Sequence, residues 1–390
     1  MTMDFENSPE ETSFRQRASA WLAEHAPRFE DPGPERLTVF ARHSPEESAE
    51  LTRRALEWQA AKHAAGWAGI ALPREVGGGG GTLAQSLMFA QEEGRYRIPK
   101  DALSVTMGMV APTLARWGTA AQHTGLLGPL LAGRRLWCQL FSEPGAGSDL
   151  AGLQTCARRH GEGWVVNGHK VWTSYAQFAD FGYLLARTGE EPRHRGLTAF
   201  VVDMRTPGIT VEPLRQATGA STFNEVFLDD VVLPESAPLG AVGQGWQVAM
   251  TTLMNERYAL EPSDVPAAPL KALVEQVGAQ ADPAVGRGTA RTFTYQTILN
   301  VLQVRLLTAA AEGREPGPEG SVTKLLTTRG QAAAADTALL ALGEEALLDN
   351  VWTEFALGSL GLRIGGGTDE ILKNIIAERV LGLPREGAIS

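Results

Sequence analysis

The chain has 390 residues, of which 43% are hydrophobic and 21% charged, and its formal net charge is -10. This length is about two to three times that of a typical domain, and the composition is that of a globular protein, so a single small module and wholesale disorder are excluded. The acidic balance, without any basic cluster, argues against nucleic acid or an anionic membrane as a partner.

The two cysteines, Cys138 and Cys156, are too few for a disulfide scaffold and lack the spacing of a zinc or thioredoxin-like motif. We expect no metal site. The N-terminus lacks the cationic start and apolar stretch of a signal peptide, and no segment is apolar for long enough to cross a bilayer. The sequence therefore predicts a cytoplasmic protein without a membrane partner.

The first third of the chain has a helical period. Apolar residues three and four positions apart predict helices over residues 13–26, 47–66 and 82–95. The run Gly77 to Gly81 between the last two predicts a flexible connection, and it is no P-loop because no Lys-Ser or Lys-Thr follows. We place an N-terminal helical domain at residues 1–133.

The period changes to alternating near Trp137, which predicts a β domain over residues 134–240. The expected strands are residues 164–166, 169–174, 181–187, 197–203, 209–214 and 223–233. Asn167-Gly168 separates two strand-like runs by two residues, which predicts a hairpin turn there.

Long helical segments return in residues 241–390 and favour a bundle. The fold class is therefore α+β and mostly helical, with a small β domain in the middle. Alternating strand and helix units are absent, which disfavours a parallel dinucleotide-binding sheet.

Residues 137–155 form the first segment with chemical potential: a strand-like run ends in a Pro-Gly turn, followed by Gly145, Gly147 and Ser148. Small residues let backbone amides approach a ligand, and such a concavity suits phosphate. An ordinary loop is the alternative.

Residues 167–174 form the second segment. Trp172 and Ser174 are two positions apart, so a strand presents both on one face, where a flat aromatic beside a hydroxyl suits a planar cofactor. An ordinary core tryptophan is the alternative.

Residues 245–260 form the third segment, a predicted helix. Its expected apolar stripe consists of Trp246, Ala249, Met250, Leu253 and Leu260. Glu256 lies at the edge of this stripe, where apolar surroundings raise the pKa of a carboxyl group toward that of a base working near neutral pH. The alternative is a boundary glutamate paired with Arg257 or a neighbouring helix.

Residues 363–386 form the fourth segment, in which Gly365 to Gly367 lead into a helix with Thr368 as N-cap, ended by Gly382 and Pro384. A helix N-terminus behind glycines suits an anion. A well-capped last helix is the alternative.

Taken in order, these segments resemble the acyl-CoA dehydrogenase family over nearly the whole chain. The resemblance is carried by HAAGWAGIALPREVGG, FSEPGAGSDLAGLQT, NGHKVWTS, FGYLLART, RGLTAFVVDM, PGITVEPL, FNEVFLDDVVLP, GQGWQVAMTTLMNER and GGTDEILKNIIAERVLGLPR. It implies a C-terminal four-helix bundle and FAD held between the last two domains and shared with a neighbouring subunit, in a homodimer or homotetramer.

The resemblance also implies roles for single residues. It places Gln139, Leu140, Phe141 and Ser142 along the isoalloxazine, Ser148 near the phosphate-bearing end of a ligand, Trp172 stacked on the flavin, Ser174 on its reactive nitrogen, Thr368 and Glu370 near the cofactor, and Arg287 at the FAD of another subunit. The Arg-x-x-Phe-Gly motif that carries this arginine in many members is absent.

Many members carry the catalytic glutamate immediately before the Gly-Thr of the C-terminal motif, where this chain has Gly366. A second group, which includes isovaleryl-CoA dehydrogenase, has the base in a Glu-Arg pair, which matches Glu256-Arg257 here. The resemblance thus implies that Glu256 takes the α-proton, that Arg257 binds CoA or orients Glu256, and that the Gly366 N–H and a ribityl hydroxyl of FAD bind the thioester carbonyl.

The implied function is FAD-dependent α,β-dehydrogenation of an acyl-CoA to the 2-enoyl-CoA, with an electron-transfer flavoprotein as electron acceptor. An acyl group on a protein-tethered pantetheine is an alternative substrate. The alternative functions are a flavin monooxygenase or oxidase on the same fold, and a partner subunit in a mixed dehydrogenase assembly.

Overall fold

The structure is a computed structural model that describes residues 8–31, 37, 40–191, 193–259, 267–278, 282–314 and 317–385. The side chains of residues 256–259 and 267 lie outside this description. The chain divides into two compact units. We call residues 1–41, 82–97 and 260–390 the bundle unit, and residues 42–81 and 98–259 the sheet unit.

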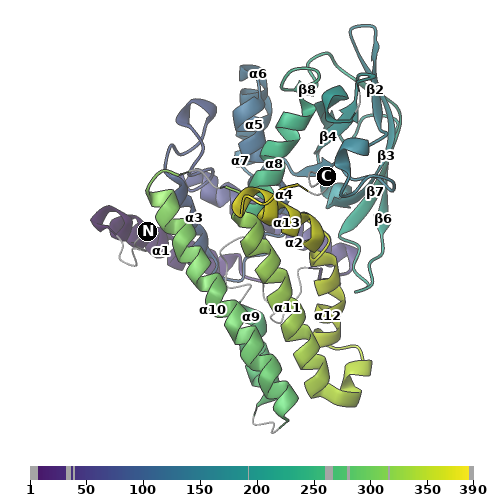
Figure 1. Ribbon diagram of the computed structural model, residues 1–390. Coiled ribbons are helices and arrows are strands. Elements are labelled where there is room, and N and C mark those ends of the chain that lie inside the picture. Colours follow the sequence, from purple (N-terminus) through teal and green to yellow (C-terminus); the bar gives the residue numbers. More distant parts are fainter. Residues whose placement is uncertain are drawn as a thin grey trace. The chain divides into compact units, whose positions relative to one another are not determined.

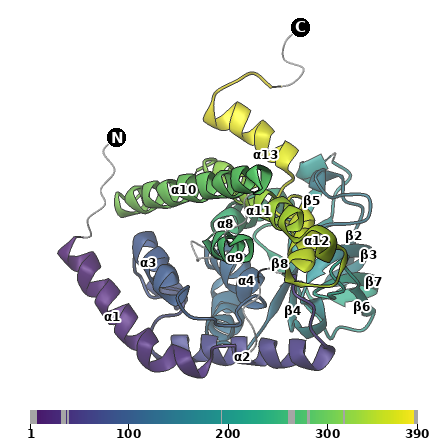
Figure 2. The ribbon, with the colours of Figure 1, turned by 90° about the horizontal axis from the view of Figure 1, so that it is seen from below.

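The bundle unit is helical (Figures 1 and 2). Its α-helices are α1 (Pro9–His25), α3 (Leu83–Glu93), α9 (Ala267–Val277), α10 (Pro283–Ala311), α11 (Gly320–Leu342), α12 (Val351–Leu362) and α13 (Asp369–Ile375). Helices α9 to α12 share an apolar cluster that includes Leu273, Val285, Ala334 and Phe355. Burial of this cluster is what holds the long helices against one another.

Side-chain caps define where several of these helices begin. Ser8 and Glu11 form a capping box at α1, and Thr82 and Gln85 form one at α3. These pairs satisfy backbone N–H groups that have no partner within the helix, so the polar residues set the start and the apolar stripe sets the length.

The sheet unit contains eight strands among its described residues, joined in one sheet (Figure 1). They are β1 (Trp137–Leu140), β2 (Cys156–His160), β3 (Gly163–Ser174), β4 (Phe181–Arg187), β5 (Leu197–Asp203), β6 (Ile209–Leu214), β7 (Phe223–Leu233) and β8 (Pro238–Leu239). Their order is β6-β7-β3-β2-β4-β5-β8, and β1 pairs with β4 in parallel.

Helices cover part of this sheet. The α-helices of the sheet unit are α2 (Pro45–Ala64), α4 (Leu103–Val105), α5 (Ala111–Trp117), α6 (Ala120–Gln122), α7 (Gly128–Leu131) and α8 (Gly245–Ala259). Short 3-10 helices span Ala26–Arg28, Arg74–Val76, Leu150–Gly152, Ala176–Phe178, Arg193–Gly196 and Gly343–Leu347, and π-helical turns span Thr106–Val110, His123–Leu127 and Ile376–Val380.

Alternate residues of the central strands enter two different cores. Tyr183 and Ala199 pack with the helical residues Leu114 and Val248 in one apolar cluster. Their neighbours Leu184 and Phe200 pack with residues of β2, β3 and β7 in the other. This follows from the two-residue period of a strand, and it leaves β4 and β5 covered on both faces.

The predicted fold class is confirmed: an N-terminal helical part, a middle β part and a C-terminal helical part. The strands predicted at 181–187, 197–203, 209–214 and 223–233 are β4 to β7. The expectation of a flexible run at Gly77 to Gly81 is wrong. The amides of Gly79, Gly80 and Gly81 donate to the carbonyls of Gly69, Leu72 and Ile70 at 2.7–2.9 Å, so the run is fastened along its length.

The predicted hairpin at Asn167-Gly168 is also wrong, because β3 runs straight through both residues. The turn joins β2 to β3 at Gly161, which has a φ of 58°. Asn167 instead exchanges two hydrogen bonds of 2.9 Å with Asp230 of β7 at an irregularity in strand pairing. Gly168 is required by packing, since a Cβ there would lie 2.2 Å from the Thr155 Oγ1.

We predict that Gly168→Ala lowers the free energy of unfolding by about 1–3 kcal/mol, because the added methyl group overpacks the contact with Thr155. Urea denaturation of the purified protein measures this change. Gly125→Ala is the matched control, since a Cβ at Gly125 meets nothing within 4 Å. Equal stability of the two variants would contradict the packing explanation.

Candidate active site

The segment from Gln139 to Ser142 ends β1 and enters a turn of the sheet unit. Leu140 is fully buried in the sheet, and Phe141 packs on Tyr183 with ring centroids 5.0 Å apart. Gln139 and Ser142 are half-buried. A ligand beside this segment would therefore meet the side chains of Gln139 and Ser142 and the main chain of the other two.

The turn that follows is open to solvent. Glu143 and Ala146 pair through backbone hydrogen bonds of 3.0 and 3.1 Å, and Gly145, Gly147 and Ser148 are exposed. A Cβ added at Gly145 or Gly147 would meet nothing within 4 Å. The turn thus leaves room for a ligand to approach its backbone.

Trp172 lies outside the apolar core, with 57% of its surface exposed, and its φ is 60°. The pairing of β3 with β7 shifts between Lys170 and Thr173, and the Val171 N–H donates to the Ser142 carbonyl at 2.9 Å instead. A left-handed conformation at a bulky residue costs about 1–2 kcal/mol, and such strain persists only where the surroundings impose it. Trp172, Ser142 and half-buried Ser174 thus lie at one junction of β1 and β3.

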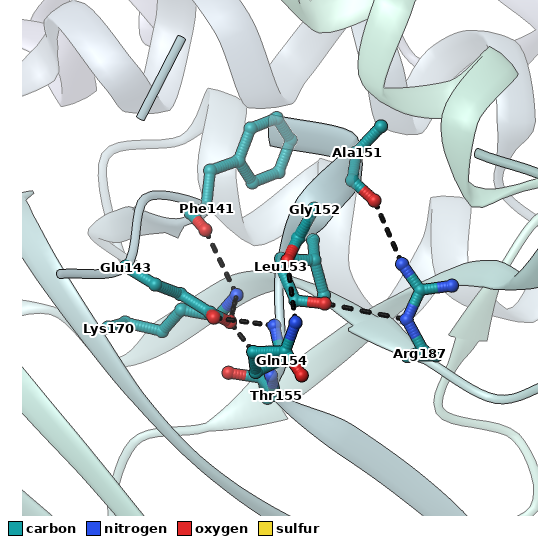
Figure 3. A network of polar contacts seen from close by, with 9 residues as sticks. All are labelled: Phe141, Glu143, Ala151, Gly152, Leu153, Gln154, Thr155, Lys170 and Arg187. Carbon is teal, nitrogen blue, oxygen red and sulfur yellow. Dashed lines mark hydrogen bonds and ion pairs between the residues drawn. The ribbon is translucent and has the colours of Figure 1, made fainter. Parts of the chain in front are cut away.

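A buried ion pair joins residues next to this junction, Glu143 after Ser142 and Lys170 before Val171 (Figure 3). The Lys170 Nζ donates to a Glu143 carboxylate oxygen and to the Phe141 carbonyl, both at 2.9 Å, and the lysine is fully buried. The same carboxylate accepts the N–H groups of Gln154 at 2.6 Å and Thr155 at 2.9 Å. Every polar atom of the pair therefore has a partner, as a buried charge requires.

Burial and charge act against each other in this pair. Burial lowers the pKa of Lys170 to about 8, although the Glu143 carboxylate opposes the shift. Burial raises the pKa of Glu143, but the Lys170 charge and the hydrogen bonds from Thr155 and Gln154 outweigh it, and the net shift is downward. The pair is therefore charged at neutral pH.

Arg187 of β4 holds the loop that follows the glycine turn. Its guanidinium donates to the carbonyl of Ala151 at 2.8 Å and to that of Leu153 at 3.4 Å (Figure 3). Residues 151–155 are thus fastened at one end by Arg187 and at the other by Glu143.

The buried side of helix α8 overlaps the predicted stripe at Ala249, with Trp246 and Leu253 packed against the same apolar cluster, but it is centred on other residues. Val248, Ala249 and Thr252 are fully buried, whereas Trp246, Met250 and Leu253 are half-buried. The reason is polar: the Thr252 hydroxyl lies 3.2 Å from that of Tyr183 and 2.8 Å from that of Thr113, so a threonine absent from the expected stripe anchors the helix.

The side chains of Glu256 and Arg257 lie outside the described residues, as does Leu260. Both Glu256 and Arg257 belong to α8, and helical geometry places Glu256 one turn beyond Thr252.

The glycine turn before α13 belongs to the bundle unit. Gly366 and Gly367 have φ values of 67° and 95°, and Thr368 caps α13 by accepting the Ile371 N–H at 3.2 Å. The buried Lys324 donates to the Gly367 carbonyl at 2.7 Å.

Buried Asp369 fastens the other side of this turn. Its carboxylate pairs with Arg363 at 3.0 Å and accepts the Thr328 hydroxyl at 3.2 Å. The predicted site residue Glu370 is exposed and lies 3.5 Å from Lys373. Arg287 is exposed on α10, in the same unit.

The structure therefore brings Gln139 to Ser142, Trp172 and Ser174 to one junction of the sheet unit, which also contains Ser148 in the turn after β1 and α8, and it places Gly366, Thr368 and Glu370 at one turn of the bundle unit. Sequence reasoning missed the residues that fasten these segments: Glu143, Lys170, Arg187, Thr252, Lys324 and Asp369. The available signal was a lysine inside a predicted strand, as in His-Lys-Val-Trp. A lysine that is buried in a sheet is rarely unpaired, so such a residue predicts a buried carboxylate partner.

The exposed indole at a strained junction and the open glycine turn fit a planar, phosphate-bearing cofactor. Together with the order of helices, sheet and helices, they define a flavoenzyme of the class predicted from the sequence. The family profiles agree: the acyl-CoA dehydrogenase N-terminal domain matches residues 8–134, the middle domain 138–231 and the C-terminal domain 243–381. The chain belongs to the acyl-CoA dehydrogenase family, is an enzyme of that class and uses FAD.

Individual relatives support this assignment. Acyl-CoA dehydrogenase IpdE1 of Mycobacterium tuberculosis is 34% identical, covering 96% of this chain and 98% of its own. Acyl-CoA dehydrogenase FadE34 of the same organism is 41% identical over 79% of this chain, but the match spans only 44% of FadE34. Among solved structures, the Tcur3481-Tcur3483 steroid ACAD has a TM-score of 0.80 at 25% identity and covers 98% of this chain and all of its own.

None of the helices among the described residues is both long and apolar enough to span a bilayer. No group of three or more His, Cys, Asp or Glu side chains in the same ranges is arranged to hold a metal ion.

Glu143 makes stability depend on acidity in a defined direction. Because its pKa is lower in the folded protein than its ordinary value of 4.5, its contribution is complete above pH 4.5 and is lost as the pH falls through the folded pKa. Glu143→Gln is expected to lower the free energy of unfolding at neutral pH. We predict that this loss, measured by urea denaturation, becomes smaller as the pH falls below the folded pKa of Glu143.

Glu235→Gln is the control, because this exposed glutamate in the turn after β7 forms an ion pair with Arg159 of β2 at 3.5 Å. A stability loss in Glu143→Gln that is the same at all pH values would contradict the prediction.

Proposed function

We propose that the chain removes two hydrogens from adjacent carbons of an acyl-CoA thioester to form the 2-enoyl-CoA, with Glu256 as the base. FAD, when bound, accepts the two electrons and the hydrogen that leave the β-carbon. The chain would then follow the branch of the family that places its base in a Glu-Arg pair, as isovaleryl-CoA dehydrogenase does. We take residues 1–133, 134–240 and 241–390 as the three domains.

The anchoring of α8 is the observation that carries this proposal. The Thr252 hydroxyl binds Tyr183 of β4, and Tyr183 packs on Phe141 within the proposed flavin-facing segment. Burial raises the pKa of Tyr183, so the hydroxyl that accepts this hydrogen bond from Thr252 stays uncharged. A base one turn beyond Thr252 would be held at a constant distance from that segment, and such fixed placement is what proton abstraction needs.

Gly366 supports the same assignment from the other unit. The position where many family members carry the glutamate has no side chain here, and its φ of 67° suits glycine. The Gly366 N–H is proposed to donate to the thioester carbonyl, where negative charge develops as the α-proton leaves. Arg257 is proposed to bind the CoA moiety or to orient Glu256.

Other proposed contacts of the chain follow the family pattern. Trp172, Ser174 and the segment from Gln139 to Ser142 would contact the flavin, Ser148 the phosphate-bearing end of a ligand, and Thr368, Glu370 and Arg287 the FAD of the same or another subunit. We propose an electron-transfer flavoprotein as acceptor, a homodimeric or homotetrameric assembly, and a cytoplasmic location.

The similarity to a steroid ACAD supports a bulky, steroid-like acyl group as the first substrate to test. An anaerobic screen should compare it with straight and branched acyl-CoA thioesters, and with one acyl group presented on a carrier protein. Loss of flavin absorbance then reports which thioester and which carrier are used.

We predict that Glu256→Gln slows anaerobic flavin reduction by acyl-CoA about 10²–10⁴-fold, the usual contribution of a general base, while the FAD content stays unchanged. Stopped-flow absorbance measures the rate. Glu275→Gln, at an exposed glutamate of α9, is the control and should reduce at the wild-type rate. Unchanged reduction in Glu256→Gln would overturn Glu256 as the base, whereas a wild-type flavin that no acyl-CoA reduces would favour an oxygen-using flavoenzyme.

A partner subunit in a mixed dehydrogenase assembly is the second candidate, favoured by Gly366 and by the two-protein Tcur3481-Tcur3483 structure. It predicts that the purified chain alone is colourless and binds FAD only after a second, homologous chain is added. Absorbance and size measured together decide this. A yellow chain that reduces its flavin alone contradicts the partner role.

A further inference from the structure

We propose that the Glu143–Lys170 pair is the positioning element that locks the two proposed flavin-facing segments, Gln139 to Ser142 and Trp172 to Ser174, into one surface. The proposal rests on FAD contacting these segments, as proposed above. It assigns a role in cofactor binding to two side chains that are buried and touch no ligand themselves.

Apart from each other, the partners of the two side chains are main-chain atoms of neighbouring segments. Lys170 binds the Phe141 carbonyl, and Glu143 binds the N–H groups of Gln154 and Thr155 (Figure 3). The pair therefore joins three stretches of chain: the end of β1, the end of the loop that carries Ser148, and β3 just before Trp172. No backbone ladder joins the end of β1 to β3, because β1 pairs with β4, and the bond from the Val171 N–H to the Ser142 carbonyl links the two strands only after Lys170.

The position of Lys170 along β3 gives the pair its effect on Trp172. Lys170 is the last residue in register with β7 before the shift, and the next residue, Val171, donates to the Ser142 carbonyl. Holding Lys170 against Phe141 thus brings the two strands together at the point where Trp172 adopts its left-handed φ. Without that restraint, the strand can return to regular pairing with β7 and turn the indole away.

Stability alone is a poor explanation for such a pair. Two charges removed from water are costly, and apolar residues of similar size commonly serve a core as well or better. A pair retained for stability should therefore be replaceable by two apolar side chains. A pair that orients main chain should not be, because apolar side chains cannot hold a carbonyl and two N–H groups in place.

The experiment measures FAD affinity and thermal stability separately in three variants of the full chain. Lys170→Met leaves an unpaired buried carboxylate and should lose both. The double variant Lys170→Met with Glu143→Met should regain part of the stability, yet bind FAD at least about tenfold more weakly than the wild type. Glu143→Gln keeps the shape of the side chain and loses the acceptor for one N–H. Its FAD affinity should therefore fall by a smaller factor than that of the double variant.

Fluorescence titration of the apoprotein with FAD, well below every melting temperature, gives the affinities. Arg205→Met is the matched control, since it removes an exposed cation of the same unit paired with Asp203 at 2.7 Å, and its FAD affinity should equal the wild-type value. Wild-type FAD affinity in the double variant would overturn the proposal. If the double variant does not fold, Glu143→Gln decides by the same criterion.

No acyl-CoA enters this titration, so the outcome is independent of whether the chain is a dehydrogenase. Failure of the proposed function would instead show as a wild-type flavin that no acyl thioester reduces.

Discussion

One buried cation, the Lys170 ammonium, determines how the end of β1 meets β3. No backbone ladder joins these two strands there, and the ammonium needs both the Glu143 carboxylate and the Phe141 carbonyl to be tolerated. The strain at Trp172, the bond from Val171 to Ser142 and the open glycine turn all lie within a few residues of Lys170 or Glu143. The local backbone is therefore set by an electrostatic requirement more than by strand propensity.

The same physical solution recurs in the other unit. There the buried Lys324 donates to the Gly367 carbonyl, and the buried carboxylate of Asp369 pairs with Arg363 on the opposite side of the glycine turn. In both places a buried lysine donates to a main-chain carbonyl and a buried carboxylate holds the chain nearby, and at Gly366 and Gly367 these contacts select one conformation among those that glycine allows. Open turns are thereby made rigid without bulky side chains that would fill the space a ligand needs.

The sequence predicted the periodic elements well because apolar spacing reports burial directly. Strands β4 to β7 agree with the structure for this reason. Thr368 agrees because a threonine hydroxyl at that position accepts a free N–H of the helix. It failed where tertiary contacts override local signals: Asn167-Gly168 is a turn dipeptide placed inside a strand by Asp230 and Thr155, and α8 is turned by the hydroxyl of Thr252. The residues that hold these segments, such as Glu143 and Lys170, were missed because a single buried charge produces no periodic pattern in the sequence. It appears only as one polar residue within an apolar run.

The exposure of Trp172 has an optical consequence. The chain has nine tryptophans, and Trp172 is the one classed as exposed, whereas the others are buried or half-buried. A small aqueous quencher such as acrylamide will therefore act mainly on the emission of this indole, and a stacked isoalloxazine would both shield it and accept its excitation energy. The part of the protein's intrinsic emission that acrylamide quenches thus reports mainly on one residue at the junction of β1 and β3, without any attached dye.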